Sequence, residues 1–355
     1  MSSSNLSRIA RKMLLWVATG AATFMIGFFM VGAVIHLSHG KTAMPRANTP
    51  ETPVGAVIHT MGEGALAMLA LTPSTKKEAS LVAAMIENHE TARPYQAGLS
   101  QALIVFEILV EGEISRFLAL FRADNLPPRI GPTRSLRPAF IDAVEAYAPL
   151  ILHIGGSAPA YEKLAAHPEI PHHDGIRFDG ETYQRDPLIP PPHNLFMSRD
   201  ALLPVIADFT KKGQLHPVPF PLYPVDSVSP HGERAKEVTI DFHSPLHDVT
   251  YTYDALKQTY LRSLSGAPKQ ATPANVLILE TDVQGLGIVG SIPWTKTFGK
   301  GRLLLFTRGA AVQGSWVRGR SERFRFLDTS GKPLPLRAGQ TWITFLPSLE
   351  RVQWK

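Results

Sequence analysis

The sequence contains no cysteine among its 355 residues. The chain therefore holds together without disulfides, and it has no thiol that could carry a lipid or act as a nucleophile. The serine-hydrolase motif G-x-S-x-G and the zinc-protease motif H-E-x-x-H are also absent. These absences weaken the case for an enzyme without removing it, and no cofactor is indicated.

The charge is only slightly unbalanced, with 36 Lys and Arg against 30 Asp and Glu and a net charge of +6. Such a surplus suits an anionic surface, for example lipid head groups or an acidic polymer of the cell envelope. The sequence contains none of the usual nucleic-acid-binding motifs. Nucleic acid is not expected as a partner, because most of the chain is predicted to be exported.

One long apolar run dominates the N-terminus. Residues 13–35 contain no charged side chain, and at about 1.5 Å per residue they span roughly 35 Å, enough to cross a bilayer. Arg8, Arg11 and Lys12 precede the run, so the positive-inside rule keeps the N-terminus in the cytoplasm. A cleaved signal peptide, the alternative, usually has an apolar core of only about 7–15 residues. We therefore predict a single-pass signal anchor in the cytoplasmic membrane, with a basic tail at 1–12, the membrane segment at 13–35 and a linker at 36–53.

The pattern of residues 54–210 predicts an α/β domain that contains a mixed sheet and helices. Apolar strands are expected at 81–87, 102–110, 113–121 and 149–154, and helices are expected from residue 138, at 159–166 and at 199–209. Two details support the helices, because Pro138 suits a first turn and Ser198 suits an N-cap.

The strands at 102–110 and 113–121 are expected to form a hairpin around the two-residue turn Glu111-Gly112. When the strands pair directly across this turn, Glu107 lies opposite Arg116. A charge within an otherwise apolar strand must be paired or otherwise satisfied. We therefore predict an ion pair between Glu107 and Arg116.

A Pro-rich bridge at 211–235 precedes a change of hydrophobic period. From 236 to 355, apolar and polar residues alternate in short runs such as VTIDF, VTYTYD and TWITFLP. This alternation predicts a mainly antiparallel β domain. Four arginines of this domain are expected on a solvated edge, where charge discourages edge pairing; they are Arg318, Arg320, Arg323 and Arg325.

Arg134, Ser135 and Arg137 immediately precede a predicted helix. Free N–H groups at a helix N-terminus favour an anion, and arginine adds planar, bidentate donors for phosphate or carboxylate. The alternative is that these arginines pair with Asp and Glu within the fold. Gly155 and Gly156 lie between a strand and a helix, a layout that brings N–H groups to a phosphate but also fits a simple tight turn.

Residues 167–192 show no clear periodicity, and an irregular segment of this length is usually functional or mobile. The segment contains His172, His173 and Asp174, but no ligand spacing repeats, so no metal site is predicted. Its later polar residues and those that follow are expected to close over the arginines; they are Arg185, Asp186, His193 and Asn194.

Several short motifs resemble the YerB-like family, which groups bacterial proteins described as lipoproteins of unknown biochemical function. The resemblance runs from about residue 81 to 347. In the first domain it is carried by AMIENH (84–89), ARP (92–94), GLSQA (98–102), EG (111–112), SRF (115–117), IGP (130–132), RS (134–135), RP (137–138), GGS (155–157), RD (185–186) and PHNL (192–195). In the second domain it is carried by YTYD (251–254), GSW (314–316), RF (323–324) and GQTWI (339–343).

The resemblance implies an N-terminal α/β domain, a C-terminal β-rich domain and a location in the bacterial envelope. Members of the family are often lipid-anchored through a cysteine, so in this chain the membrane segment would have to provide the tether. The hairpin followed by a Pro-Arg cluster is also faintly similar to the LytR-CpsA-Psr enzymes, whose characteristic Asp-Thr and Pro-Arg-Asp runs are not evident here.

We therefore expect a membrane-anchored extracytoplasmic (periplasmic) module that binds an anionic envelope ligand or acts with cell-wall synthesis proteins. The alternative is an envelope enzyme, a phosphoryl- or glycosyl-polymer transferase or hydrolase, that uses Glu87, Glu111, Asp186 or His193 for proton transfer at the same cleft. A scaffold that contacts cell-wall synthesis proteins through the β domain is a third possibility. The candidate ligand-binding residues are Asn88, His89, Arg93, Glu107, Glu111, Arg116, Arg134, Ser135, Arg137, Gly155, Gly156, Arg185, Asp186, His193 and Asn194.

Overall fold

The structure, a computed structural model, describes residues 77–226, 232–288 and 291–355. The predicted basic tail, membrane segment and linker, at 1–12, 13–35 and 36–53, lie outside the described residues. Among the residues that are described, no helix is long and apolar enough to cross a membrane.

The first half of the chain forms a mixed sheet, as the sequence predicts. β2 pairs in antiparallel fashion with β4 and in parallel with β6, and β6 is parallel to β7. Every side chain of β2 is buried, which explains why it is a continuous apolar run rather than an alternating one. The strands are β2 (Leu81–Ile86), β3 (Ile104–Leu109), β4 (Ser115–Arg122), β6 (Leu150–His153) and β7 (His172–Asp174).

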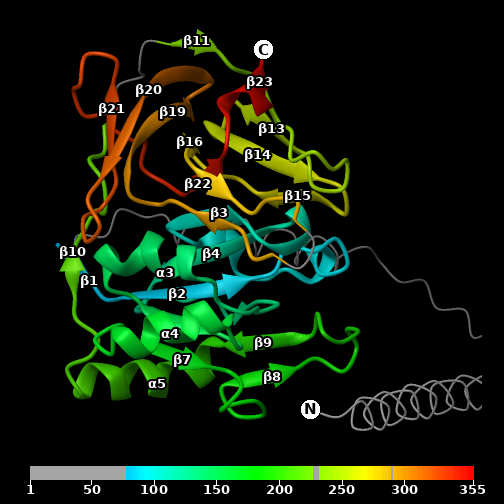
Figure 1. Ribbon diagram of the computed structural model, residues 1–355, viewed down its shortest axis with the longest axis vertical. Coiled ribbons are helices and arrows are strands. Elements are labelled where there is room, and N and C mark those ends of the chain that lie inside the picture. The colour runs from blue at the N-terminus through cyan, green and yellow to red at the C-terminus, as the bar shows by residue number, and fades with distance from the viewer. Residues whose placement is uncertain (1–76, 227–231, 289–290) are drawn as a thin grey trace, which may run out of the picture. The chain divides into compact units, whose positions relative to one another are not determined.

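Strands from the second half extend the same sheet. β22 lies between β16 and β3 and is parallel to both, so residues on either side of the Pro-rich bridge pair with each other. The order is β11-β20-β19-β16-β22-β3-β4-β2-β6-β7, with β21 paired to β20 (Figure 1). The added strands are β11 (Glu233–Arg234), β16 (Asn275–Glu280), β19 (Gly299–Thr307), β20 (Ala310–Arg318), β21 (Arg325–Asp328) and β22 (Thr341–Leu346).

A second, five-stranded sheet belongs wholly to the C-terminal half, and all its pairings are antiparallel. Buried and half-buried residues alternate along β14, as expected for a strand with one face on a core. The predicted antiparallel β part is thus confirmed. The order is β15 (Ala267–Ala271), β14 (Thr259–Leu264), β13 (Val249–Asp254), β12 (Glu237–Ile240) and β23 (Val352–Trp354).

Three α-helices are described: α3 (Pro138–Val144), α4 (Ala158–Ala166) and α5 (Arg199–Lys211). The side chains of Ser157 and Ser198 accept hydrogen bonds from the amides at the third position of α4 and α5. These caps satisfy N–H groups that the helices leave free. α5 therefore begins where the sequence predicts and continues two residues beyond the predicted end.

The large sheet separates two apolar cores. Side chains of α3 and α4, such as Phe140 and Leu164, pack on one face. On the other face, α5 contributes Leu202, and the five-stranded sheet contributes Tyr251 and Tyr260. On this face, α5 therefore covers the end of the large sheet that is formed by the first half of the chain. The five-stranded sheet covers the end that is formed by the second half.

Shorter elements complete the fold, and two of them, β7 and β8, lie in the segment 167–192 that shows no periodicity. The short strands are β1 (Glu78–Ala79), β5 (Arg129–Ile130), β8 (Tyr183–Arg185), β9 (Leu195–Ser198), β10 (Val218–Pro219), β17 (Val283–Gln284) and β18 (Trp294–Thr295). The 3-10 helices are Arg93–Tyr95, Leu99–Gln101, Glu111–Glu113, Glu145–Tyr147 and Leu349–Arg351.

The predicted register of the β3–β4 hairpin is wrong by one residue. Glu107 faces Phe117, and Arg116 faces Ile108. The connection holds three residues rather than two, with Gly112 and Glu113 in the left-handed region at φ 71° and 58°. A shift of one residue moves a side chain to the opposite face of a strand. The predicted ion pair between Glu107 and Arg116 therefore does not form.

The prediction of a solvated edge is also wrong for Arg318. Its guanidinium is buried and donates to the carbonyls of Thr297 and Glu322 at 2.9 and 2.7 Å. It also lies 4.9 Å from the centre of the Phe324 ring. Backbone carbonyls and an aromatic face thus satisfy this charge inside the fold.

Candidate functional site

Three parallel strands end at one edge of the large sheet. β2, β6 and β7 run in the same direction. Glu87 directly follows β2, Gly155 lies two residues after β6, and Asp174 ends β7. Ligands of open α/β sheets bind outside the carboxyl ends of parallel strands. This edge is therefore the candidate site.

The segment of residues 131–137 crosses this edge. Thr133 forms a β-bridge with Ile86 at the end of β2, and Leu136 forms one with Gly156 after β6. The amide of Ile154 donates to the carbonyl of the residue between these two bridges, Arg134, at 3.2 Å. Arg134 and Arg137, which belong to this segment, are thereby fixed over the ends of β2 and β6.

Five side chains meet here, and we call them the arginine cluster: Arg116, Arg134, Arg137, Glu87 and Glu111. Arg134 Nη2 lies 2.5 Å from Glu87 Oε1, and Arg137 Nη2 lies 2.5 Å from Glu111 Oε1. Arg116 Nη2 is 4.0 Å from Glu111 Oε2, and its Nη1 donates at 2.7 Å to a carbonyl of the 131–137 segment. The arginines therefore lie together, and they pair with acids within the fold, as one of the two alternatives from the sequence expects.

The cluster carries one more positive charge than negative, because three guanidiniums face two carboxylates. Arginine side chains in it are 14–19% exposed. Burial and, to a lesser extent, the nearby charge of Arg137 lower the pKa of Arg116 to about 10, although the carboxylate of Glu111 opposes this shift. Arg116 stays protonated at neutral pH, and an anion placed beside it would relieve the repulsion among the guanidiniums.

Two histidines border the cluster on the side of Glu87. His193 Nδ1 lies 3.0 Å from Glu87 Oε1 and 3.1 Å from Arg134 Nη2. This nitrogen can donate to the carboxylate or accept from the guanidinium, but not both. The His89 ring stacks on His193 with centroids 5.1 Å apart. Glu87 Oε2 is buried and has no hydrogen-bond partner among the described residues.

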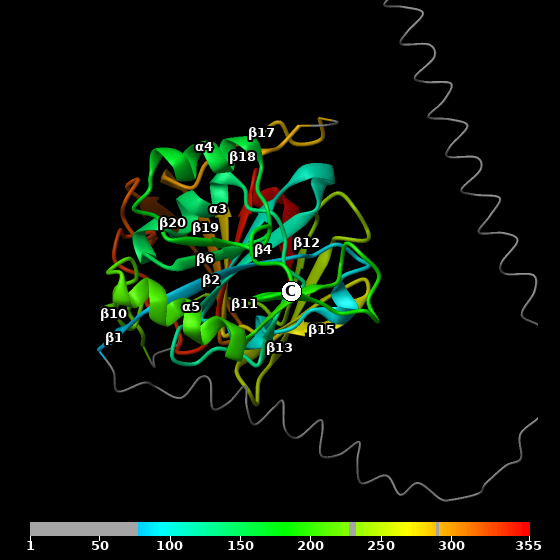
Figure 2. The same cartoon turned by 90° about the horizontal axis from the view of Figure 1, so that it is seen from below.

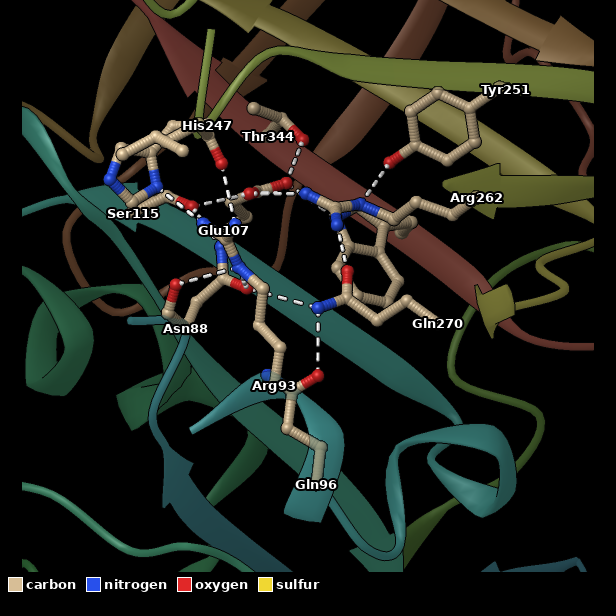
Figure 3. Close-up of polar contacts among 12 residues, drawn as sticks. Asn88, Arg93, Gln96, Glu107, Ser115, His247, Tyr251, Arg262, Gln270 and Thr344 are labelled. Carbon is tan, nitrogen blue, oxygen red and sulfur yellow. Dashed lines mark hydrogen bonds and ion pairs between the residues drawn. The ribbon is translucent and has the colours of Figure 1, made fainter. Parts of the chain in front are cut away.

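Glu107, on β3, points to the face of the sheet opposite to Arg116 and lies in a buried network (Figure 3). Its Oε1 accepts from Arg262 at 2.6 Å and from Ser115 at 2.6 Å. Its Oε2 accepts from Trp342 Nε1 at 2.8 Å and from Thr344 at 3.0 Å. Glu107 and Arg262 are both fully buried, so every lone pair that the carboxylate presents is used within the fold.

Asn88 and Arg93, two more candidate residues, belong to this network rather than to the arginine cluster. Asn88 donates to Ser115 at 2.8 Å and accepts from Gln270 at 3.0 Å. Arg93 donates to the carbonyls of Leu246 and Ser265 at 2.5 and 2.7 Å. Both residues therefore join the first half of the chain to the second (Figure 3).

Arg185, Asp186 and Asn194 lie on the β8–β9 hairpin and pair locally. Arg185 Nη2 is 2.6 Å from Asp179, and Asp186 accepts from Arg129 at 2.7 Å. Asn194 donates to the carbonyl of Asp186 at 3.3 Å. Of the loop residues expected to close over the arginines, the structure brings only His193 into contact with them.

Ser135 and Gly155 lie together beside the cluster. The hydroxyl of Ser135 would be 3.6 Å from a Cβ added at Gly155, whose φ of 65° favours glycine. The amide of Gly155 donates to Asp174 at 2.8 Å, so it is not free for a phosphate. Gly155 thus serves a tight turn that anchors the edge.

A separate cleft of about 1010 Å³ lies between α4 and α5, at the sheet edge formed by β7. Tyr161 and Leu164 of α4, His172 of β7, and Pro204 and Phe209 of α5 line it. In Figure 1, β7 lies between the two helices. The sequence does not predict this cleft, because the residues that line it come from three segments that share no motif.

A pair of neutral histidines lies beside this cleft: His172 lines it, and His153 is fully buried. His153 Nδ1 donates to the carbonyl of Gly155 at 2.8 Å, which leaves its Nε2 to accept from His172 Nδ1 at 3.1 Å. Burial lowers the pKa of both rings. Among the described residues, no group of three His, Cys, Asp or Glu side chains could hold a metal ion.

Both halves of the chain match family models. Residues 68–212 match the N-terminal domain of a protein family of unknown function (DUF3048), and residues 238–343 match its C-terminal domain. A curated protein of Bacillus subtilis (strain 168), "Putative lipoprotein YerB", is 31% identical over 282 residues, which cover 76% of this chain and 82% of that protein. The chain belongs to the YerB-like family.

A solved YerB structure agrees with this assignment. The crystal structure of YerB protein from Bacillus subtilis matches with a TM-score of 0.69 at 28% sequence identity, and the match covers 80% of this chain and 96% of that chain. The resemblance read from the sequence motifs is thus confirmed. The family is described as one of unknown function, so this YerB-like chain receives no activity from it.

The residue that sequence analysis missed in this YerB-like fold is Arg262, the partner of Glu107. A signal for it exists in β14, where Tyr260, Arg262 and Leu264 occupy the alternate positions that point to the core. A charged residue in the buried phase of a strand needs a partner. The sequence does not identify that partner, which lies 155 positions away.

Proposed function

We propose that this chain is a membrane-anchored, extracytoplasmic envelope protein that binds an anionic ligand at the arginine cluster. The name of its Bacillus subtilis relative, a lipoprotein by description, supports the envelope location. The apolar run at 13–35, preceded by basic residues, supports an anchor with its N-terminus inside. A chain without cysteine needs such an anchor, because it has no thiol for a lipid.

The observation that carries the proposal is the imbalance of charge in a partly exposed cluster. Three guanidiniums share two carboxylates, and their side chains retain 14–19% exposure. Planar guanidiniums bind phosphate and carboxylate oxygens through two parallel hydrogen bonds. A phosphate- or carboxylate-bearing group is therefore the expected ligand, and cell-wall synthesis proteins that present such a group are the expected partners.

Pyrophosphate is a suitable probe, because it carries several anionic oxygens in a small volume. We expect the detergent-solubilised full chain to bind it in a calorimetric titration, with an affinity that falls as salt rises. Arg137→Gln removes one charge-assisted contact and should weaken binding about tenfold. Arg137 is the best choice, because its partner Glu111 is 33% exposed and can be hydrated when left alone.

The matched control is Arg302→Gln, which removes the same charge from a surface pair with Glu280. It should bind pyrophosphate like the unmodified chain. Equal affinities for the two variants, or no binding by the unmodified chain, would contradict an anion site at the cluster. Circular dichroism before each titration establishes that the variants are folded.

One observation favours an enzyme as the second candidate. Glu87 presents a buried oxygen, beside His193 and Arg134, that has no hydrogen-bond partner in the described part of the chain. A carboxylate and an imidazole that share a hydrogen bond are suited to proton transfer in phosphoryl- or glycosyl-polymer transfer or hydrolysis. Loss of turnover in Glu87→Gln with pyrophosphate affinity retained would favour this alternative. Asp186 is less suitable, because Arg129 already holds it at 2.7 Å.

A further inference from the structure

The cleft between α4 and α5 is a second concave site. Its volume of about 1010 Å³ is at the upper end of the range of about 300–1,000 Å³ that is usual for sites of small molecules. The two helices lie on opposite faces of the large sheet, with β6 between them in the view from below (Figure 2). The cleft follows the edge of β7, the last strand of the sheet, and shares no residue with the arginine cluster.

Apolar side chains of both helices line the cleft. On α4, Tyr161 and Leu164 are three residues apart, a spacing that places side chains on one face of a helix. The apolar lining residues of α5 also share a face and are partly or fully exposed; they are Ala201, Pro204, Val205 and Phe209. Apolar surface is therefore available to a ligand on two walls of the cleft.

The ring of Tyr161 is a fixed aromatic surface in this lining. Its hydroxyl donates to Asp174 at 2.7 Å, and a Cβ added at Gly156 would lie 3.5 Å from the ring. The residue nevertheless remains 37% exposed. A ring that is held at its polar end loses little entropy when a ligand packs against it.

His172 adds a hydrogen-bond acceptor. Its Nδ1 donates to His153 Nε2 at 3.1 Å, because the carbonyl of Gly155 fixes the tautomer of His153. Burial lowers the pKa of His172, so the ring is neutral at pH 7 and its Nε2 carries a lone pair. Within the described part of the chain, no group donates to this nitrogen. A hydroxyl or an amide N–H of a ligand is the group that it would accept.

The charges that line the cleft nearly cancel, with three acids and two bases. Lys212 pairs with Asp208 at 2.6 Å, and Asp174 accepts three hydrogen bonds from within the fold. Arg177 and Glu181 are exposed, and neither forms an ion pair among the described residues. This lining does not select a strongly charged ligand, but its donors and acceptors suit an uncharged polar one.

Two other occupants fit the cleft less well. β7 holds only three residues, and the carbonyl of its last residue, Asp174, already accepts from the amide of Arg177 at 3.0 Å. The edge therefore offers few backbone groups to an added peptide strand. An acyl chain would remove the charged groups of Arg177, Glu181 and Lys212 from water without replacing their hydrogen bonds, which is costly.

We propose that the cleft between α4 and α5 binds an uncharged oligosaccharide. Sugar rings combine C–H faces, which pack on aromatic and aliphatic side chains, with hydroxyl groups that both donate and accept hydrogen bonds. Tyr161 packs against a sugar ring, His172 accepts from a hydroxyl and Arg177 donates to one. This site is separate from the arginine cluster and does not depend on the ligand of the cluster.

Calorimetric titration of the full chain in phosphatidylcholine nanodiscs tests the proposal, because nanodiscs avoid detergents with sugar head groups. The probes are chitotetraose and maltotetraose, two uncharged tetrasaccharides that differ in linkage and ring substituents. The uncharged peptide acetyl-tetra-alanine amide is the comparison. We expect at least one tetrasaccharide to bind with an affinity that hardly changes with salt, because no net charge is neutralised, and we expect no binding of the peptide.

Two pairs of variants assign the binding to the cleft. Arg177→Gln should weaken it about fivefold, because it removes a charged hydrogen-bond donor. The matched control is Arg325→Gln on β21, since Arg325 is also exposed and forms no ion pair among the described residues; it should bind like the unmodified chain. Tyr161→Ala should weaken binding about tenfold, and Tyr161→Phe, which keeps the ring, should bind more tightly than Tyr161→Ala.

Absence of binding by both tetrasaccharides would overturn the proposal. Equal affinities of the Arg177→Gln and Arg325→Gln variants would also overturn it, and these exposed positions decide the question even where Tyr161→Ala does not fold. Binding of the peptide in place of the tetrasaccharides would assign the cleft to peptides instead. Pyrophosphate titration of the same nanodiscs is an independent readout: tetrasaccharide binding without pyrophosphate binding refutes only the anion site, and the reverse result refutes only the oligosaccharide site.

Discussion

Replacing Glu107 by Gln tests whether the buried network holds the two halves of the sheet together. The carboxylate accepts four hydrogen bonds, two at each oxygen, and one of them comes from the fully buried Arg262. Glutamine keeps the shape but removes the charge, and its NH₂ group meets donors where an acceptor is needed. Arg262 is then left in the core without a counter-charge. Losing one partner of such a pair should lower the free energy of unfolding by about 3–5 kcal/mol.

Urea denaturation of the detergent-solubilised chain, followed by tryptophan fluorescence, measures this loss, because Trp342 donates to Glu107 and reports on the site directly. The double variant Glu107→Gln with Arg262→Met should be more stable than Glu107→Gln alone, since it removes the stranded charge. This reversal is the specific signature of a buried ion pair. A simple packing defect would instead make the double variant less stable.

Arg302→Gln serves as the control here also, because it opens a salt bridge on the surface and should leave the denaturation midpoint nearly unchanged. If Glu107→Gln has the same midpoint as Arg302→Gln, the network does not contribute to stability as its burial implies. The reasoning about the two halves would then be refuted.

Acid and backbone geometry provide two further predictions. Burial lowers the pKa of His173 to about 4, so this side chain binds a proton more tightly in the unfolded chain than in the folded one. The free energy of unfolding should therefore keep its full value above pH ~6.5 and fall by up to about 3 kcal/mol as the pH drops to about 4. Thermal unfolding at several pH values measures this, and a profile that stays flat in this range would contradict it. Gly131→Ala should destabilise by about 1–3 kcal/mol, because φ is 144° and a Cβ would lie 2.9 Å from the Phe196 ring. Gly180→Ala, where φ is 88° and no atom lies within 4 Å, should cost less in the same assay, and equal losses would assign the effect to φ alone.

The elements with strong local signals are the ones that the sequence predicts correctly. β2 is a continuous apolar run, and β13 alternates polar and apolar residues, so periodicity alone distinguishes a strand covered on both faces from one covered on a single face. Ser198 before Arg199 marks the start of α5 for an equally local reason, since its hydroxyl accepts a hydrogen bond from the free amide of Ala201 in the first turn.

Register and strand order depend on information that no local window holds. The β3–β4 turn gained one residue because Glu113 adopts a left-handed conformation that glutamate rarely takes. β22 enters the sheet next to β3, although more than 200 residues separate them in the chain. The hydrophobic pattern of β22 indicates a strand that is buried on both faces, but it does not indicate which strands pair with it.

The candidate site illustrates the same division. Arg134 and Arg137 stand close together in sequence and can be singled out from it, whereas Glu87 reaches Arg134 across 47 positions. Sequence analysis treated ligand binding by the arginines and their pairing within the fold as alternatives. In the structure they do pair, and a net positive charge still remains, which only a count over the assembled cluster reveals.

β4 connects the two polar groups of this fold because its side chains alternate between them. Ser115 and Phe117 face the buried network, where Ser115 contacts Glu107 and Phe117 packs on Trp342. Arg116, between them, faces the arginine cluster. A change that displaces β4 at the network therefore also displaces a guanidinium of the cluster, although no hydrogen bond of Arg116 within the described residues joins the two groups. Weaker anion binding in a Glu107 variant would for this reason not place Glu107 in the binding site. Arg137→Gln is the variant that separates binding from architecture, because the partner of Arg137, Glu111, is 33% exposed.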